Sequence, residues 1–332
     1  MRTLMLGAGV IGSFNAARLK EAGQDITLLA RGRRLQDLRE HGVVLEDFRT
    51  ERRTITQVPL VDRLGTDDAY DLAIVAVKAD QLSSTLPILA QNHRIPSVLF
   101  LGNNAAGPQE LIEALGRERV LLGMPNTGGT RVDHVVRYLW SRWFVVLFGE
   151  LDDVVTPRTQ AIVRLFRSAG LSARVVKNVD AYLKTHAAGL PALAGAVYMA
   201  GGHVRQLAHT PEAMKLNLQA FREALRALRA VGVPLRPSAT RLVEWIPAPI
   251  MIFALRLILD SKLAEMGAQP HLETALREMK ELADELRAIL RQSGLPSPAS
   301  NVLFAQIDAQ FRLRCSEFSE AVPTHTVASE LS

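Results

Sequence analysis

The chain has 332 residues, enough for two domains, since single domains usually contain roughly 100–200 residues. Its content of 48% hydrophobic and 22% charged residues is ordinary for a globular protein. The sequence has one cysteine, Cys315, which excludes a disulfide framework and favours a reducing, cytoplasmic compartment. The net charge of +5 is modest and dispersed, whereas a nucleic-acid-binding surface would need a concentrated basic stripe, so no nucleic-acid partner is expected.

The first half of the chain alternates short apolar runs with helical stretches. Strands are predicted at Thr3–Leu6, Asp25–Leu29, Leu72–Val77, Ser97–Leu101 and Val120–Gly123. Helices are predicted between them at Val10–Ala22, Arg34–Glu40, Gln81–Ala90 and Pro108–Leu115. This alternation is typical of a parallel, doubly wound sheet, so residues 1–177 are predicted to form an α/β domain. Val43–Leu45 and Arg53–Thr56 predict a small excursion, and Tyr138–Glu150 predicts antiparallel strands that close the domain.

From residue 178 the pattern changes to long helical periodicity. Thr210-Pro211-Glu212 predicts a helix start, because the hydroxyl can cap, proline fits the first turn and the acid faces the positive end of the helix dipole. One apolar stripe ends before Gly294 and consists of Leu272, Leu276, Met279, Ala283, Leu286 and Leu290. Residues 178–314 are therefore predicted to form an all-helical domain for substrate binding or dimerisation, and residues 315–332 a disordered tail.

The most apolar segment of the chain is Ile246–Leu259. It contains Pro247, Pro249 and Arg256 and is shorter than the ~20 apolar residues of a membrane-spanning helix. No membrane partner is therefore expected. Trp245, Ile250, Phe253 and Leu257 are interpreted as core residues or as a homodimer surface in the helical domain.

A glycine-rich turn follows the first predicted strand and opens the first predicted helix: Gly7, Ala8, Gly9, Val10, Ile11 and Gly12. In this setting Gly7 permits a tight turn, Gly9 allows a pyrophosphate to approach the backbone, and Gly12 allows the helix and strand to pack closely. The free N–H groups at the helix start suit phosphates. The fold class is thus predicted to be an N-terminal Rossmann-type doubly wound sheet followed by an all-helical C-terminal domain.

The second predicted strand ends in a basic segment that contains Arg31, Arg33 and Arg34. An NAD enzyme usually places an acid here for the ribose 2′-hydroxyl, and this chain has none. A guanidinium can bind a 2′-phosphate through two hydrogen bonds. The sequence therefore predicts NADP as the cofactor, with Arg31 the foremost of the three arginines.

Short segments later in the chain carry a family resemblance. Val77-Lys78-Ala79-Asp80-Gln81 ends one predicted strand, and Leu101-Gly102-Asn103-Asn104-Ala105-Ala106-Gly107 ends the next. Asp180-Ala181-Tyr182-Leu183-Lys184 opens the helical half, and Glu278-Met279 and Gly294-Leu295-Pro296-Ser297-Pro298 follow near its end. In this order, over about residues 1–310, the segments resemble the ketopantoate reductase (2-dehydropantoate 2-reductase) family.

The resemblance implies reduction of a 2-keto acid or related carbonyl compound by NADPH, which serves pantothenate biosynthesis when 2-dehydropantoate is the substrate. Lys184 would protonate or polarise the carbonyl oxygen, which becomes an alkoxide as hydride arrives. Glu278 would contact the substrate or hold the lysine. Lys78 and Asn103 would line the nicotinamide side of the cleft.

The chain departs from the family at the substrate end. Ala188 and Ala192 stand where the family has asparagines four and eight residues after its lysine. Loss of two amides beside the lysine predicts a larger and more apolar pocket, in which ketopantoate is a poor substrate and bulkier carbonyl compounds are favoured. The family's substrate-binding serine has no clear counterpart, since Ser261 fits only with inserted residues.

Two histidines are further candidates at the substrate end. His271 lies seven residues before Glu278 and shares a face with it if both are helical, so His271 is a candidate substrate ligand. His186 lies two residues after Lys184 and is expected to point largely away from it. The eight histidines show no HExxH or comparable spacing, so no metal site is expected.

Two other functions stay open. One is an NADP-dependent dehydrogenase of a different substrate, such as an N-carboxyalkyl amino acid. The other is a non-catalytic NADP-sensing protein, which Ala188 and Ala192 keep open, although Lys184 and Glu278 favour an enzyme.

Overall fold

In the computed structural model, which describes residues 1–262, 264, 265, 269 and 275–320, the apolar runs of the first half pair into one sheet. Its order is β12-β11-β8-β7-β6-β1-β2-β5, and all neighbours are parallel except β8 and β11. The strands are β1 (Thr3–Leu6), β2 (Ile26–Leu29), β5 (Leu60–Val61), β6 (Leu72–Val75), β7 (Val98–Leu101), β8 (Val120–Met124), β11 (Val145–Gly149) and β12 (Ser172–Val175).

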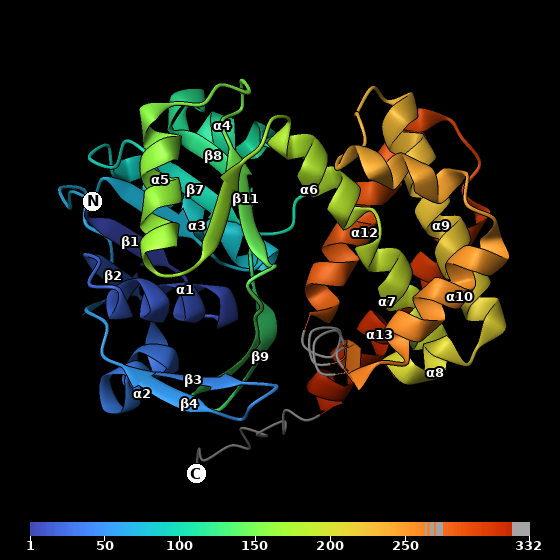
Figure 1. Ribbon diagram of the computed structural model, residues 1–332, viewed down its shortest axis with the longest axis horizontal. Helices are drawn as coiled ribbons and strands as arrows, with labels where there is room; N and C mark the ends of the chain where they lie inside the picture. The colour runs from blue at the N-terminus through green and yellow to red at the C-terminus, as the bar shows by residue number, and fades with distance from the viewer. Residues whose placement is uncertain (263, 266–268, 270–274, 321–332) are drawn as a thin grey trace, which may run out of the picture.

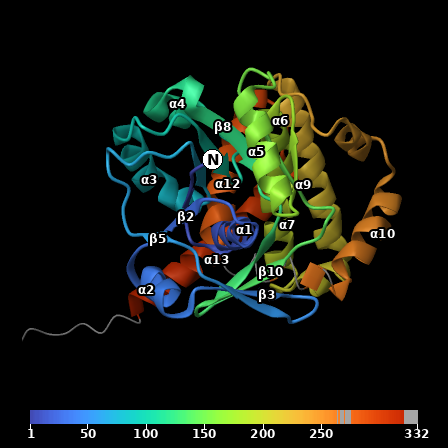
Figure 2. The same ribbon diagram turned by 60° about the vertical axis from the view of Figure 1, so that its left-hand side comes forward.

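Helices cover both faces of this sheet (Figures 1 and 2). They are α1 (Val10–Glu21), α2 (Gly32–His41), α3 (Ala79–Gln91), α4 (Gln109–Leu115) and α5 (Pro157–Ser168), with a 3-10 turn η1 (Arg117–Arg119). Successive strand side chains point to opposite faces, so Leu4 and Leu6 enter the core beneath α3 and α4, and Met5 enters the core beneath α1 and α5. The predicted doubly wound sheet is confirmed.

A second, four-stranded sheet in the order β4-β3-β10-β9 lies below the first in Figure 1. Its strands are β3 (Val43–Asp47), β4 (Arg53–Thr56), β9 (Gly128–Val132) and β10 (Val135–Leu139). The antiparallel strands predicted within Tyr138–Glu150 are confirmed in part, because β10 runs antiparallel to β9 and β11 antiparallel to β8, but the two strands lie in different sheets. β10 pairs with β3 and β9, and β11 joins the large sheet between β8 and β12. The turn between β10 and β11, closed by the Phe144 N–H to the Ser141 carbonyl, carries the chain from one sheet to the other.

After Val175 the described residues form helices and the turns between them. The helices are α6 (Val179–Ala187), α7 (Leu190–Met199), α8 (Val204–Ala208), α9 (Pro211–Ala230), the 3-10 helix η2 (Ser238–Glu244), α10 (Ala248–Leu259), α12 (Leu276–Ser293) and α13 (Pro298–Glu320). Small residues let α7 lie close to α13, since a Cβ on Gly195 would stand 2.3 Å from the Leu303 carbonyl oxygen.

The predicted start at Pro211 and the predicted stop at Gly294, which has a left-handed φ of 67°, are both confirmed. The predicted tail is wrong over residues 315–320, because α13 continues to Glu320. The sequence contains no proline or glycine between Pro298 and Pro323 to end that helix earlier. Residues 321–332, and Leu272 of the predicted stripe, lie outside the described residues.

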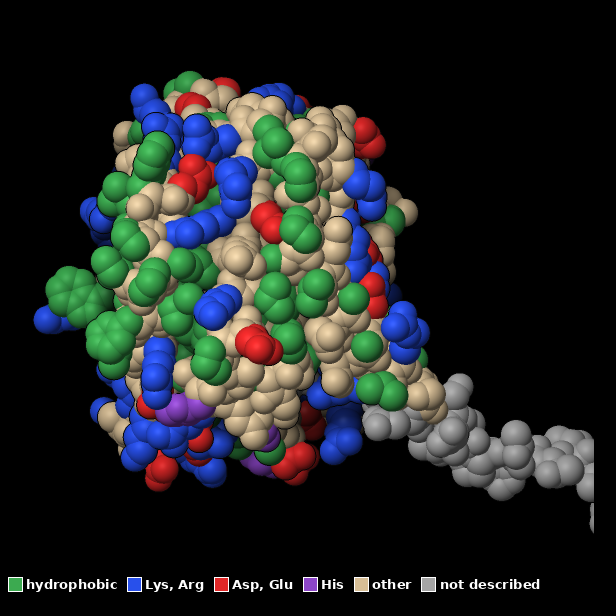
Figure 3. All heavy atoms as spheres, turned by 90° about the vertical axis from the view of Figure 1, so that its right-hand side faces the viewer, with side chains coloured by type: hydrophobic (Ala, Val, Ile, Leu, Met, Phe, Trp, Pro, Cys, Tyr) green, Lys and Arg blue, Asp and Glu red, His purple; other side chains and the backbone are tan. Residues whose placement is uncertain are grey.

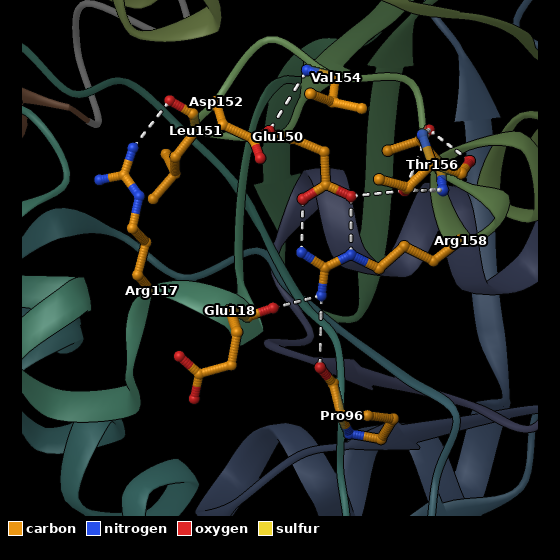
Figure 4. A network of polar contacts seen from close by, with 10 residues as sticks. Pro96, Arg117, Glu118, Glu150, Leu151, Asp152, Val154, Thr156 and Arg158 are labelled. Atoms are coloured by element: carbon orange, nitrogen blue, oxygen red, sulfur yellow. Dashed lines mark hydrogen bonds and ion pairs between the residues drawn. The ribbon is translucent and has the colours of Figure 1, made fainter.

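An ion pair between a buried carboxylate and a half-buried arginine joins the end of β11 to the start of α5 (Figure 4). The Glu150 carboxylate is 5% exposed and accepts from Arg158 Nε at 2.8 Å, from Arg158 Nη2, and from the Thr156 hydroxyl at 2.6 Å. Arg158 also donates to the carbonyls of Glu118 and Pro96. The pair therefore holds together segments that lie up to 62 residues apart in the sequence.

Removing Arg158 should be costly, because it leaves a buried carboxylate without its cation. We expect Arg158→Met to lower the free energy of unfolding by about 3–5 kcal/mol, and Arg158→Met with Glu150→Gln to recover much of that loss. Urea unfolding followed by circular dichroism measures both. Arg164→Met, at an exposed arginine of the same helix, is the control and should change stability by less than about 0.5 kcal/mol. A small effect of Arg158→Met would contradict this account.

Candidate active site

A cavity of about 1540 Å³ lies at the carboxyl ends of the parallel strands, between the sheet and the helical part. The ends of β1, β2, β6, β7 and β8 form one wall, which is where doubly wound sheets bind ligands. From the helical part it is lined by Leu183, His186, Leu190, Ala275, Glu278 and Glu285. The loop between β10 and β11 adds Trp143, which is 75% exposed, and Phe144.

The glycine turn between β1 and α1 is shaped for a phosphate. Gly7 has a φ of +107°, and a Cβ there would stand 2.4 Å from the Ala76 carbonyl oxygen. A Cβ on Gly12 would stand 1.8 Å from the Gly7 carbonyl oxygen, whereas one on Gly9 would meet nothing within 4 Å. Gly9 precedes α1 and provides no side-chain cap. The first turn of α1 therefore presents its N–H groups to open space, which fits a pyrophosphate.

The three arginines after β2 have different positions. Arg31 is exposed and lines the cavity, whereas Arg33 is exposed but is not a lining residue. Arg34 is buried and donates to the Ala8 carbonyl, the Ser13 hydroxyl and the His134 carbonyl, each at 3.1 Å. Its burial, together with the nearby charge of Arg131, lowers the pKa of Arg34 to about 10. Arg34 therefore braces the glycine turn, and Arg31 is available to a ligand.

The cavity gathers most of the cofactor residues predicted from the sequence. Its lining includes Gly7, Ala8, Gly9, Val10, Ile11, Arg31, Lys78 and Asn103. Gly12 is not a lining residue, because its Cα lies against the Gly7 carbonyl inside the turn. Gly12 therefore shapes the turn from behind the cavity wall.

Two carboxylates of α12 hold the loop after β7. Asn103 Nδ2 donates to Glu278 Oε1 at 2.7 Å, and the backbone N–H groups of Ala105 and Ala106 donate to Glu285 Oε2 at 2.7 and 3.1 Å. Burial raises the pKa of Glu285, and the two N–H donors oppose that shift. The acids are seven residues apart and so share one face of α12. This face fixes the loop against the helical part.

The expected contact between Lys184 and Glu278 is absent. Lys184 Nζ instead donates to Asp180 Oδ2 at 2.6 Å, one helical turn earlier on α6. It also lies beside Gly107, where a Cβ would stand 3.1 Å from Nζ. Gly107 lines the cavity and Lys184 does not. Both predicted catalytic residues therefore touch the same loop, Lys184 at its end and Glu278 at its start, with different partners.

The structure also bears on the other residues that were predicted at the substrate end of the cavity. Ala188 and Ala192 are buried in the helical core and are not lining residues, so the predicted enlargement of the pocket by these alanines is wrong. Ser261 is not a lining residue either, and its hydroxyl donates to the Ile258 carbonyl. His271 lies outside the described residues. His186, expected to point away from the lysine, is exposed and lines the cavity.

Three lining features were not predicted. Glu285 lies on the predicted apolar helix, where its spacing from Glu278 was the available signal. Arg131 comes from β9, a strand with two glycines and no apolar alternation. Trp143 and Phe144 lie in a turn that was predicted to be strand. Among the described residues, no three histidine, cysteine or acidic side chains are grouped to hold a metal ion.

Comparison with known proteins agrees with this geometry. The sequence profile of the family described as ketopantoate reductase PanE/ApbA matches residues 3–152. An uncharacterised oxidoreductase, YkpB, of Bacillus subtilis is 28% identical over 180 residues, and a 2-dehydropantoate 2-reductase of Pyrococcus horikoshii is 25% identical over 182. These alignments cover 53% and 54% of this chain and 57% of each relative.

Solved structures share the fold over nearly the whole chain. A putative ketopantoate reductase from Ralstonia solanacearum superposes with a TM-score of 0.75 at 21% identity, over 95% of this chain and 98% of that one. D-mandelate dehydrogenase, in a complex with NADH and anilino(oxo)acetate, superposes with a TM-score of 0.73 at 19% identity, over 94% and 99%. The chain is therefore similar in sequence to the ketopantoate reductase family over residues 3–152 and shares the fold of these structures over nearly its whole length.

Proposed function

We propose that this protein is an NADPH-dependent reductase of a 2-keto acid or related carbonyl compound, acting as a 2-dehydropantoate 2-reductase or a divergent relative. One observation carries the proposal: a single cavity contains both the glycine turn with Arg31 and the Asn103–Glu278 pair. These groups lie at the ends of β2, β1 and β7, within the consecutive strands β2-β1-β6-β7. Three strand spacings amount to about 14 Å, a span that suits an extended dinucleotide.

The arrangement of side chains suits carbonyl reduction. When bound, the reduced nicotinamide would supply the hydride. Asn103 gives its amide N–H to Glu278, which fixes the orientation of the amide and leaves its oxygen as an acceptor. The loop on which Asn103 lies is itself held by Glu285. The chain therefore supplies a preorganised polar wall next to the place where the carbonyl group would lie.

Lys184 is the proposed cation for the carbonyl oxygen. Its Nζ is in contact distance of Gly107, a lining residue, and its flexible stem allows the ammonium group to exchange Asp180 for a substrate on the cavity side. Catalytic hydrogen bonds often form only in the substrate complex, so the pairing with Asp180 in the free protein is compatible with this role. His186 is the competing candidate because it lines the cavity directly.

The helical part also has a surface suited to a second copy of the chain. Figure 3 looks onto this part and shows hydrophobic side chains spread over it. Six large apolar residues here are 57–80% exposed: Leu242, Trp245, Ile250, Phe253, Leu257 and Ile258. Monomers rarely expose more than about 300–600 Å² of contiguous apolar surface, and a standard interface buries about 800 Å² per partner.

A single helix provides most of this surface. Ile250, Phe253 and Leu257 follow helical spacing along α10, and two such stripes can pair with each other about a two-fold axis. No single described helix has the length and apolar character to cross a membrane, since η2 and α10 qualify only as a pair bent by 119°. We therefore propose a homodimer through this surface of η2 and α10.

The activity is tested by following NADPH absorbance with a panel of 2-keto acids that includes ketopantoate. We expect at least one to reach a kcat/KM of ~10⁴ M⁻¹ s⁻¹ or above, with lower values for NADH. Ketopantoate belongs on the panel because Ala188 and Ala192 do not touch the cavity. Tight NADPH binding without oxidation by any carbonyl compound would instead support the sensing role.

The proposed proton donor is tested with paired variants. Lys184→Ala should lower kcat by a factor on the order of 10²–10⁴ and leave NADPH affinity unchanged. Lys184→Arg keeps the positive charge but is a much weaker proton donor, so it should recover little of the rate. His186→Gln, on the same helix, should have a smaller effect. Near-normal turnover of Lys184→Ala together with a large loss in His186→Gln would assign the role to His186.

The dimer is tested by sedimentation equilibrium. Phe253→Glu with Leu257→Glu should convert a dimer to a monomer, because it places charges in the centre of an apolar contact. Leu313→Glu changes an exposed leucine on α13 and should leave the dimer intact. A wild-type chain that stays monomeric at 100 μM, or that sediments with lipid vesicles through the α10 surface, would refute the dimer.

A further inference from the structure

The cavity has a second accessible arginine at its cofactor end, contributed by the small sheet. Arg131 lies on β9, and both Arg131 and Arg31 are exposed lining residues. β9 packs beside α1, the helix that begins at the glycine turn. The small sheet therefore brings Arg131 to the same part of the cavity as the end of β2.

The interactions of Arg34 indicate that Arg31, Arg34 and Arg131 lie near one another. The charge of Arg131 is one of the causes that lower the pKa of Arg34, which itself lies three residues after Arg31. Arg34 also donates to the His134 carbonyl in the turn that follows β9. Asp37 is the acid whose charge opposes this repulsion. Positive charges that lie close together repel one another, and a bound anion lowers the free energy of this arrangement.

Arg31 and Arg131 are the two exposed guanidinium groups available to that anion. Arg34 also lines the cavity, but it is buried and donates three of its five N–H groups to the Ala8 carbonyl, the His134 carbonyl and the Ser13 hydroxyl. Arg31 and Arg131 both face the cavity. A phosphate monoester carries about −1.5 to −2 charges at neutral pH and has three acceptor oxygens, which suits two guanidinium groups.

We propose that Arg131 is a second specificity-determining residue, which binds the 2′-phosphate of NADPH together with Arg31. The inference rests on the proposed function, because it takes NADPH as the cofactor. It adds that the preference for NADPH is shared between the end of β2 and the small sheet. NADH has no 2′-phosphate, so Arg131 contributes nothing to its affinity.

Calorimetric titration of the full chain with NADPH, NADH, 2′,5′-ADP and 5′-AMP tests this role. Arg131→Gln and Arg31→Gln should each raise the Kd for NADPH and 2′,5′-ADP by roughly 10–100-fold, as expected for a hydrogen bond to a charged group. The Kd for NADH and 5′-AMP should stay within about two-fold. Arg131→Lys should retain part of the preference. Arg33→Gln is the control, because Arg33 is exposed close by and does not line the cavity.

The outcomes separate this inference from the proposed function. If the wild-type chain prefers NADPH and Arg131→Gln keeps that preference, the role of Arg131 is wrong and the cofactor assignment stands. Equal weakening of NADPH and NADH by Arg131→Gln would mean a purely structural role and would also overturn the inference. If the wild-type chain binds NADPH and NADH equally, the proposed cofactor fails and the role of Arg131 fails with it.

Discussion

The contact between α12 and the loop after β7 is the constraint on which the cavity depends. Glu278 and Glu285 bind that loop through the Asn103 amide and through backbone N–H groups. The neighbouring face of α12 is apolar and buries Met279 and Leu286 in the helical core. One amphipathic helix thus completes the core of the helical part and places two acids against the sheet domain. Without this contact the strand ends would lose the part of their facing wall that α12 provides.

The glycine turn between β1 and α1 is also held in place by a side chain from another element. Arg34 is buried, and its guanidinium links the turn at Ala8 to α1 at Ser13 and to the small sheet at His134. A ligand that binds the turn therefore meets a backbone that is already ordered. Preorganisation of this kind reduces the entropy lost on binding. The small sheet, which adds nothing to the main hydrogen-bonded ladder, serves to support the cofactor end.

The features that were predicted correctly are those set by residues close together in the sequence. The strand–helix alternation, the turn at Gly7 and the helix starting at Pro211 follow from residue spacing and from the conformations that glycine and proline favour. The small excursion predicted at Val43–Leu45 and Arg53–Thr56 is present as β3 and β4. The rest of the second sheet could not be predicted, because β3 pairs with β10 about ninety residues later and β9 has no apolar alternation. The resemblance predicted Lys184 and Glu278 as catalytic residues, and both lie next to the loop after β7. It could not reveal that Asp180, one turn away, holds the lysine in the free protein.

The exposed ring of Trp143 gives the protein an internal optical reporter. The sequence has three tryptophans, and Trp143 is the one that lines the cavity, with the Arg142 guanidinium 4.8 Å from its ring centre. Trp140 is partly buried beside Phe14, and Trp245 lies on the helical part. Reduced nicotinamide absorbs in the range in which tryptophan emits. A reduced nicotinamide bound in the cavity would therefore quench the emission of Trp143 by energy transfer, and Trp143→Phe would separate that signal from the emission of the other two rings.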